Sequence, residues 1–419
     1  MRAMVTWASS PTLETVEIPV PVPQPQVSRL ISVDLLRGLV MVVMALDHTR
    51  DFMWSGRFFP EDLTHTNGAL FFTRLITHFC APVFAFLAGT GAFLSTRRGK
   101  SVQQVSWFFL TRGLWLILLE FTVVGFAWGF TPWAHGGVIW ILGWSMLAMA
   151  AIVWLPVGWI AALGLTMIAT HNLLDPINPA WFGKFSWVWM LLHSPGEIPI
   201  TPHFSFSVRY VLIPWVGVMA AGFAFGSVLL RPDRRRTILT LGVVATVLFF
   251  VLRAINFYGN GIAGLPFGYP RSAGPWSVAP SFTLSVISFF NTLKYPPSLD
   301  YLLMTLGPAL ILLGLLDGAE AKRGLRRILA VFGRVPLFYY LAHLYVVHLL
   351  AIVVSLAFGQ PIWHGTVIAH DAHKPLGYGH GLPFVYAMWI VAVGILYMPC
   401  LWFMEFKRRH RDWAWLSYL

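Results

Sequence analysis

Long apolar runs recur along almost the whole chain, and they decide what it can fold into. A helix needs about 20 mostly apolar residues to cross the hydrocarbon core of a bilayer. Ten stretches come close to this requirement, at 31–54, 70–95, 104–128, 137–155, 158–174, 209–230, 237–257, 298–316, 337–357 and 384–405. The sequence therefore predicts an all-α, polytopic bundle of ten transmembrane helices, with 281–293 as a shorter interfacial or re-entrant segment.

The composition agrees with a chain whose outer surface faces lipid. Only 11% of the residues are charged and 57% are apolar, whereas soluble domains are roughly 25% charged. The net charge of +12 comes from short basic clusters between apolar runs and not from one continuous patch. We therefore expect the lipid bilayer as a partner and no nucleic acid.

The basic clusters also predict the orientation. They follow the second, sixth, eighth and tenth spans, whereas the opposite loops hold few Lys or Arg residues. Because cytoplasmic loops are enriched in these residues, both termini are predicted to be cytoplasmic, in a multi-pass protein of the cell (inner) membrane. The expected parts are a Pro-rich disordered tail at 1–27, a membrane domain at 28–406 and a basic tail at 407–419.

The first span is crowded with ionisable side chains, namely Asp34, Arg37, Asp47, His48, Arg50 and Asp51. Each costs roughly 2.5–3.5 kcal/mol inside hydrocarbon, so a functional reason is expected. Arg37 and His48 are eleven residues apart, about three helical turns, which places them on one face roughly 16 Å apart. Asp34 lies one turn before Arg37 and can pair with it. The structural alternative is an Asp34–Arg37 ion pair and a packed core histidine.

The second span offers Arg74 and His78, which share a helix face at i and i+4. Arg74 falls at the membrane depth of Asp47 and Asp51, so these side chains could meet. Structural ion pairing is the competing interpretation.

The eighth and ninth spans add three further candidates. Tyr339 and His343 share a face at i and i+4, and Lys294 stands at the outer start of the eighth span, where it could also simply snorkel. The pair His370 and His373 is a weak metal signal, and no metal is expected.

Several strings carry a resemblance to a known family. Arg29-Leu-Ile-Ser32-Val-Asp34-Leu-Leu-Arg37-Gly38 resembles the RxxSxDxxRG opening of the heparan-α-glucosaminide N-acetyltransferase catalytic domain family. Strings at 72–74, 77–82, 139–143, 294–298 and 333–336 resemble its bacterial members. The first span also resembles the related membrane acyltransferases that O-acylate surface polysaccharides, in which an Arg and a His stand eleven residues apart on the first helix.

The resemblance implies acyl transfer across the membrane, from cytoplasmic acetyl-CoA or another acyl-CoA to an extracytoplasmic sugar or glycan. In the polysaccharide-acylating family the His is the base and the Arg lies near the donor, which implies these roles for His48 and Arg37. The lysosomal enzyme of the N-acetyltransferase family has Asn at the position of His48. Its active-site His belongs to the first outer loop. His65 is therefore the second candidate for the base.

The predicted site has three parts. The candidate catalytic residues are His48, Asp47, Asp51, His65 and His78. The candidate donor-binding residues are Arg37, Asp34, Tyr339 and His343. The candidate substrate-binding residues are Arg74 and Lys294. A homodimer is one possible assembly. The alternative function is a transporter or flippase for a small anionic or lipid-linked substrate, although no internal repeat supports it.

Overall fold

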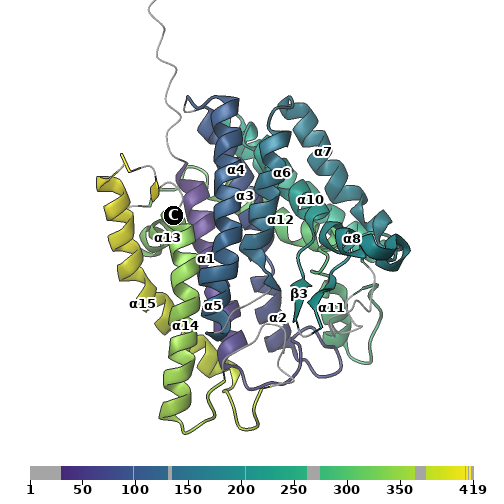
Figure 1. Ribbon diagram of the computed structural model, residues 1–419, viewed down its shortest axis with the longest axis vertical. Helices are drawn as coiled ribbons and strands as arrows, with labels where there is room; N and C mark the ends of the chain where they lie inside the picture. Colours follow the sequence, from purple (N-terminus) through teal and green to yellow (C-terminus); the bar gives the residue numbers. More distant parts are fainter. Residues whose placement is uncertain are drawn as a thin grey trace, which may run out of the picture.

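The protein, seen in a computed structural model, is a bundle of helices (Figure 1). The structure describes residues 30–97, 99–130, 135–202, 204–261, 274–321, 323–363, 374–410, 412–413 and 415–416. The predicted tail at 1–27 lies outside these residues. The basic stretch at 407–419 begins inside the last helix, which continues through Arg409.

The helices of the described residues are α1 (Ile31–Met53), α2 (Gly68–Thr77), α3 (Cys80–Thr96), α4 (Val102–Leu119), α5 (Gly125–Gly129), α6 (Val138–Ile152), α7 (Val157–Thr170), α8 (Ser186–Leu192), α9 (Leu212–Phe225), α10 (Arg234–Ile255), α11 (Phe282–Phe290), α12 (Leu299–Leu315), α13 (Gly324–Arg334), α14 (Pro336–Ala357) and α15 (Leu382–Arg409). A π-helical turn, η1 (Glu120–Val124), separates α4 from α5, and short 3₁₀ helices follow α7, precede α8 and follow α9 as η2 (His171–Leu174), η3 (Pro179–Phe185) and η4 (Val228–Leu230). The strands are β1 (His135–Gly136), β2 (Gly196–Thr201) and β3 (Phe204–Val208).

Each predicted span coincides with one helix or with two or three consecutive helical elements, and the shorter segment at 281–293 contains α11. Seven helical stretches among the described residues are long and apolar enough to cross a membrane. Helices α6 and α12 are apolar but shorter, and α1 holds the charged residues that the sequence analysis singled out. The number of crossings and their orientation remain predictions.

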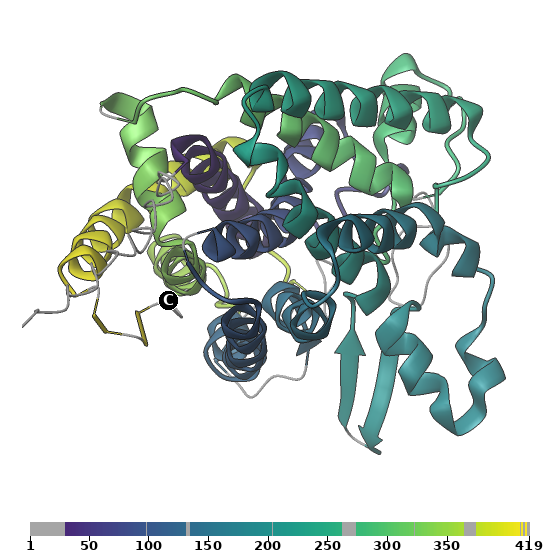
Figure 2. The ribbon, with the colours of Figure 1, turned by 90° about the horizontal axis from the view of Figure 1, so that it is seen from above.

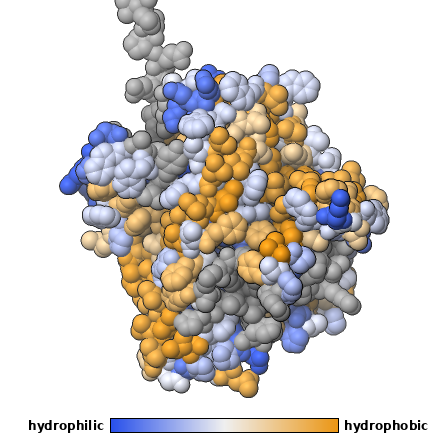
Figure 3. Space-filling view, in the orientation of Figure 1, coloured by the Kyte–Doolittle hydropathy of each residue, from blue (hydrophilic) through white to orange (hydrophobic). Residues whose placement is uncertain are grey.

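The long helices run alongside one another, with α1 packed against α3, α13, α14 and α15 (Figure 1). The start of α1 and the end of α15 lie at the same end of the bundle, which we call the N-terminal end; the other is the distal end. Apolar side chains dominate the middle of the face drawn in Figure 3, and hydrophilic ones gather toward its upper, N-terminal end. This distribution fits a protein that is embedded in lipid.

The prediction of an all-α fold needs one correction, the presence of a small sheet. Strand β3 pairs with β2 in an antiparallel hairpin and with β1 in parallel, and this small sheet lies at the edge of the bundle (Figure 2). Burial increases along β3, from the exposed Phe204 to the buried Ser207 and Val208, so the strand enters the bundle at its C-terminal end. In addition, the basic loop expected after the eighth span contains α13, whose apolar residues Ala330–Phe332 are buried while its Arg326 and Arg327 are exposed.

Two glycines set how closely α1 and α13 approach. A Cβ on Gly38 would clash with the carbonyl oxygen of Leu329, and one on Gly333 would clash with that of Asp34. Small residues allow this kind of backbone contact between membrane helices. The crossing places Arg37 against α13, where its guanidinium donates to the carbonyl oxygen of Gly333 at 3.1 Å.

Candidate active site

A polar pocket opens among α1, α2, α3, η1 and the distal loops; we call it the outer pocket. It is a cavity of about 140 Å³. Its polar lining residues are Asp47, His48, Arg50, Asp51, Glu61, Arg74, Thr77, Glu120, His135, Arg209, Tyr210, Lys294, Tyr295 and Tyr340. Such a concentration of ionisable groups inside a membrane bundle is expected at a functional site.

A chain of hydrogen bonds fixes the protonation of His48. Nδ1 of His343 lies 3.1 Å from the carbonyl oxygen of Tyr339, which can only accept, so this nitrogen carries the proton. In the neutral ring Nε2 of His343 is then an acceptor, and it lies 2.7 Å from Nδ1 of His48. The network therefore assigns the proton of neutral His48 to Nδ1 and leaves Nε2 as its basic nitrogen.

Two arginines neutralise the carboxylates around His48. Arg74 contacts Asp47 at 2.6 Å and Glu61 at 2.7 Å, and Arg50 contacts Asp47 at 2.9 Å and Asp51 at 2.6 Å. A ring nitrogen of His48 and carboxylate oxygens of Asp47 and Asp51 lie within 4.8 Å of one another. The two arginines thus offset the negative charge that these carboxylates place beside His48.

Glu61, on the loop between α1 and α2, completes this network. Burial alone would raise the pKa of Glu61, but the charge of Arg74 and the neighbouring His78 hold this pKa well below its usual range. Glu61 is therefore ionised at neutral pH. It ties the loop to α2, because both partners belong to that helix or its end.

Positive charge and phenols line the pocket opposite α1. Lys294 is 8% exposed, and it precedes Tyr295, whose hydroxyl lies 3.2 Å from that of Tyr210. Arg209 also lines the pocket; it follows β3 directly. The small sheet and the loop before α12 thus bring two cations to the same cavity.

Glu120 enters the pocket from a π-helical turn. Its carboxylate accepts from the backbone N–H of Trp140 at 3.0 Å, in the first turn of α6, where acidic groups are favoured. π-helical turns often occur at functional sites because they redirect a side chain within a helix. Regular α-helical spacing, as assumed from the sequence, would not show this turn.

A second cavity lies toward the N-terminal end; we call it the inner pocket. Its volume is about 300 Å³ and its walls are mostly apolar. Three cations line it, Arg37, Lys100 and Arg112. Arg37 also lies 3.5 Å from Asp34, which realises the spacing expected for an ion pair one turn apart.

The two pockets share part of their lining. Phe84 of α3, Val138 of α6 and Tyr340 of α14 contribute to both. The two cavities therefore adjoin at these three side chains. The arrangement could pass a thin, flexible group from one cavity to the other.

The structure brings together only some of the predicted residues. Asp47, Asp51, Arg74 and Lys294 line the outer pocket with His48, whereas Arg37 lines the inner one. Tyr339 and His343 are fully buried beside His48 and act on the pocket through the hydrogen-bond chain.

Two predicted catalytic residues lie outside both cavities. His78 is 2% exposed and lies 3.5 Å from Glu61, so its surroundings fit a structural partner of the ion network. The side chain of His65 is 61% exposed and hydrogen-bonds Asp62 at 2.8 Å. Neither is among the described residues that line the outer pocket.

Sequence reasoning missed Glu61, His135, Arg209 and Tyr340 as pocket residues. Glu61, His135 and Arg209 stand in loops or at strand ends, where helical periodicity gives no signal. Tyr340 is adjacent to Tyr339, and the choice between the two depends on the rotation of α14.

Comparison with known proteins gives one family match. Residues 29–258 match the family described as heparan-alpha-glucosaminide N-acetyltransferase, catalytic. The matched region is more than half of the chain and runs from α1 to just beyond α10. It includes His48, Arg37 and Glu120, and it ends before Lys294 and His343. No curated protein matches the chain.

Proposed function

The chain belongs to the heparan-alpha-glucosaminide N-acetyltransferase catalytic family, and from that membership we propose that it transfers an acetyl group from cytoplasmic acetyl-CoA to an extracytoplasmic sugar. The family makes the protein a membrane acetyltransferase. Donor, acceptor and sidedness are our proposal. The observation that carries it is the pair of adjoining pockets, one with three cations and one with a neutral imidazole.

The inner pocket suits the donor. Acetyl-CoA carries phosphates at one end and its thioester at the end of a long thin arm. Arg37, Lys100 and Arg112 would bind the phosphates, since Arg pairs with phosphate through two parallel N–H donors. The apolar wall of Phe84 and Val138 would accompany the arm past Tyr340, so that the thioester enters the outer pocket beside His48.

The outer pocket suits the chemistry. An acceptor amine or hydroxyl would attack the thioester carbonyl while Nε2 of His48 takes its proton. The new C–N or C–O bond forms, the C–S bond breaks, and His48 returns the proton to the leaving thiolate. Lys294 and Arg209 would stabilise the negative charge on the tetrahedral intermediate, as preorganised positive groups do in other acyl transfers.

The first prediction is that Arg37 and His48 fail differently when mutated. Losing a charge-assisted hydrogen bond costs about 1.5–3 kcal/mol, so Arg37→Ala should raise the KM for acetyl-CoA about tenfold or more. Arg37→Lys should restore this only in part, because Lys cannot bind bidentately. His48→Ala should lower kcat by roughly 10²–10⁴ while donor binding persists.

The measurement is acetyl-CoA binding and acetyl transfer by the purified full chain in detergent. Arg326→Ala removes an exposed arginine of α13, which lines neither pocket, and serves as the matched control. If His65→Ala abolishes turnover and His48→Ala does not, the base lies in the outer loop. If neither matters and acetyl-CoA does not bind, the acyltransferase proposal fails and a transporter is favoured.

A further inference from the structure

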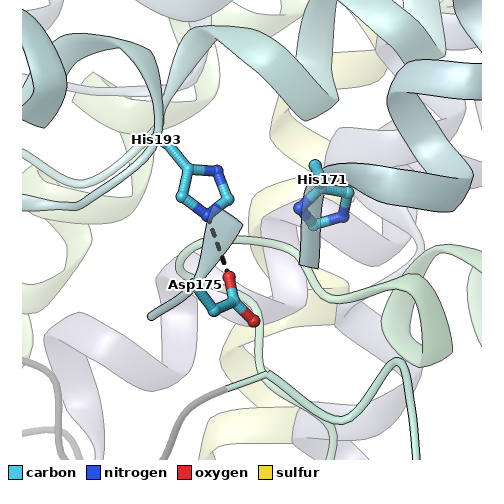
Figure 4. Close-up of side chains that lie close together, drawn as sticks. All are labelled: His171, Asp175 and His193. Atoms are coloured by element: carbon cyan, nitrogen blue, oxygen red, sulfur yellow. Dashed lines mark hydrogen bonds and ion pairs between the residues drawn. The ribbon is translucent and has the colours of Figure 1, made fainter. Parts of the chain in front are cut away.

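Two histidines and an aspartate converge at the distal end of α7, outside both pockets (Figure 4). His171 and Asp175 stand at the start and just after the end of η2, one turn apart. His193 directly follows α8, so segments about twenty residues apart meet here. One ligand atom from each side chain lies within 4.8 Å of the other two.

The cluster is buried and only partly hydrogen-bonded. His171 is 1% exposed and His193 is 2% exposed. Nε2 of His193 lies 2.9 Å from Asp175 Oδ1. Among the described residues, neither ring nitrogen of His171 nor Nδ1 of His193 has a hydrogen-bond partner. Buried polar nitrogens without partners are costly, and a cation that accepts one lone pair from each imidazole would relieve part of this cost.

The carboxylate of the cluster is held in place from behind. The side-chain amide of Asn172 donates to Asp175 Oδ2 at 2.9 Å, and its own oxygen accepts from the N–H of Leu299 at 2.9 Å. Outer partners of this kind orient ligands in metal sites. They also connect the cluster to the start of α12, just after Lys294 and Tyr295 of the outer pocket.

We propose that His171, Asp175 and His193 bind a divalent transition-metal ion of the Zn²⁺ class. Two imidazoles and one carboxylate form a common three-ligand set for Zn²⁺, with a fourth position for water. Ligand atoms about 2.0–2.2 Å from such an ion lie roughly 3.4 Å apart, so the three side chains, now within 4.8 Å of one another, would move closer together on binding. Imidazole nitrogens make Mg²⁺ and Ca²⁺ poor candidates.

The expected role of the ion is to clamp the distal end of the molecule. It would join the end of α7 to the end of α8, from which the chain enters β2 and the hairpin. Strand β3 of that hairpin leads directly to Arg209 of the outer pocket. The ion would thus hold the support of the outer pocket without touching its contents. The proposal departs from the sequence expectation of no metal, which rested on the spacing of the loop histidines and named His370 and His373 as the closest match. Those two residues lie outside the described residues.

The test uses the full chain in detergent, with any affinity tag removed, stripped by a chelator and reloaded with Zn²⁺. Metal content after desalting should be one equivalent per chain, and Zn²⁺ should raise the melting temperature. His171→Ala, His193→Ala and Asp175→Asn should abolish both effects. Asn172→Ala should weaken binding roughly 10- to 100-fold, as the loss of an outer partner does.

Two controls locate the ion. His410→Ala removes a histidine at the end of α15 and should bind Zn²⁺ like the wild type. His48→Ala tests the other group of ligand atoms, Asp47, His48 and Asp51. Zn²⁺ loss in His48→Ala with retention in His193→Ala overturns the proposal, and so does a wild type that binds no Zn²⁺.

A measurement on the wild type alone covers the case in which the variants do not fold. Co²⁺ bound at low coordination number absorbs visible light, and Zn²⁺ should displace it and remove the band. No Zn²⁺-displaceable band refutes the site. None of these readouts depends on acetyl transfer, so the metal proposal and the proposed function stand or fall separately.

Discussion

Nε2 of His48 is available as a base because of one backbone carbonyl. The carbonyl of Tyr339 fixes the proton on His343, and His343 in turn fixes the proton on His48. The sequence could place Tyr339 and His343 on one face of a helix, and it did. It could not show that His343 faces His48 of α1, because this contact depends on how α1 and α14 are rotated against each other.

The hydrogen bonds from Tyr339 through His343 to His48 give the second prediction. His343→Phe keeps the ring volume and removes the acceptor, so Nδ1 of His48 loses its partner. A buried group left without its partner costs about 1–3 kcal/mol, and kcat should fall roughly 5- to 150-fold. The KM for acetyl-CoA should not change. Steady-state kinetics on the purified variant checks this, and a raised KM with unchanged kcat would show that His343 acts on donor binding instead.

At the scale of helices, the apolar runs predict the elements well because each run is nearly as long as its helix. The π-helical turn η1 and the amphipathic α13 were not predicted. These features are set by tertiary packing or short polar segments. Their effect on the site is large, since η1 brings Glu120 to the outer pocket and α13 holds Arg37.

The third prediction concerns the crossing of α1 and α13. Gly333→Ala should separate the two helices, because the new Cβ meets the carbonyl oxygen of Asp34. Overpacking of this kind costs roughly 1–3 kcal/mol, seen as a lower melting temperature in detergent. The KM for acetyl-CoA should also rise, because Arg37 is bonded to Gly333.

The matched control for this variant is Gly394→Ala in α15, where a Cβ would meet nothing within 4 Å. It should leave the melting temperature unchanged or slightly raised, given the higher helix propensity of Ala. Equal destabilisation by both substitutions would contradict the close-contact argument.

At the scale of the whole molecule, the start of α1 and the end of α15 lie at the same end of the bundle. This agrees with the charge distribution, which predicts that the N-terminal end is cytoplasmic. The fourth prediction is therefore that a reporter active only outside the cytoplasm is silent when fused after Leu416. The same reporter inserted at the exposed turn of Gly183 should be active. The opposite pattern of activity would reverse the proposed sidedness and, with it, the side from which the donor enters.

The layer of Phe84, Val138 and Tyr340 between the two pockets also bears on energy coupling. With water-filled cavities on either side, most of the membrane voltage would fall across these few side chains. A unit charge moved through such a layer exchanges about 2.3 kcal/mol with each 100 mV. An acetyl group arriving as a neutral thioester moves no charge, since the phosphates stay with the three cations and the proton cycles at His48. Acetylation across the membrane would then proceed at the same rate in energised and de-energised cells, driven by the thioester alone.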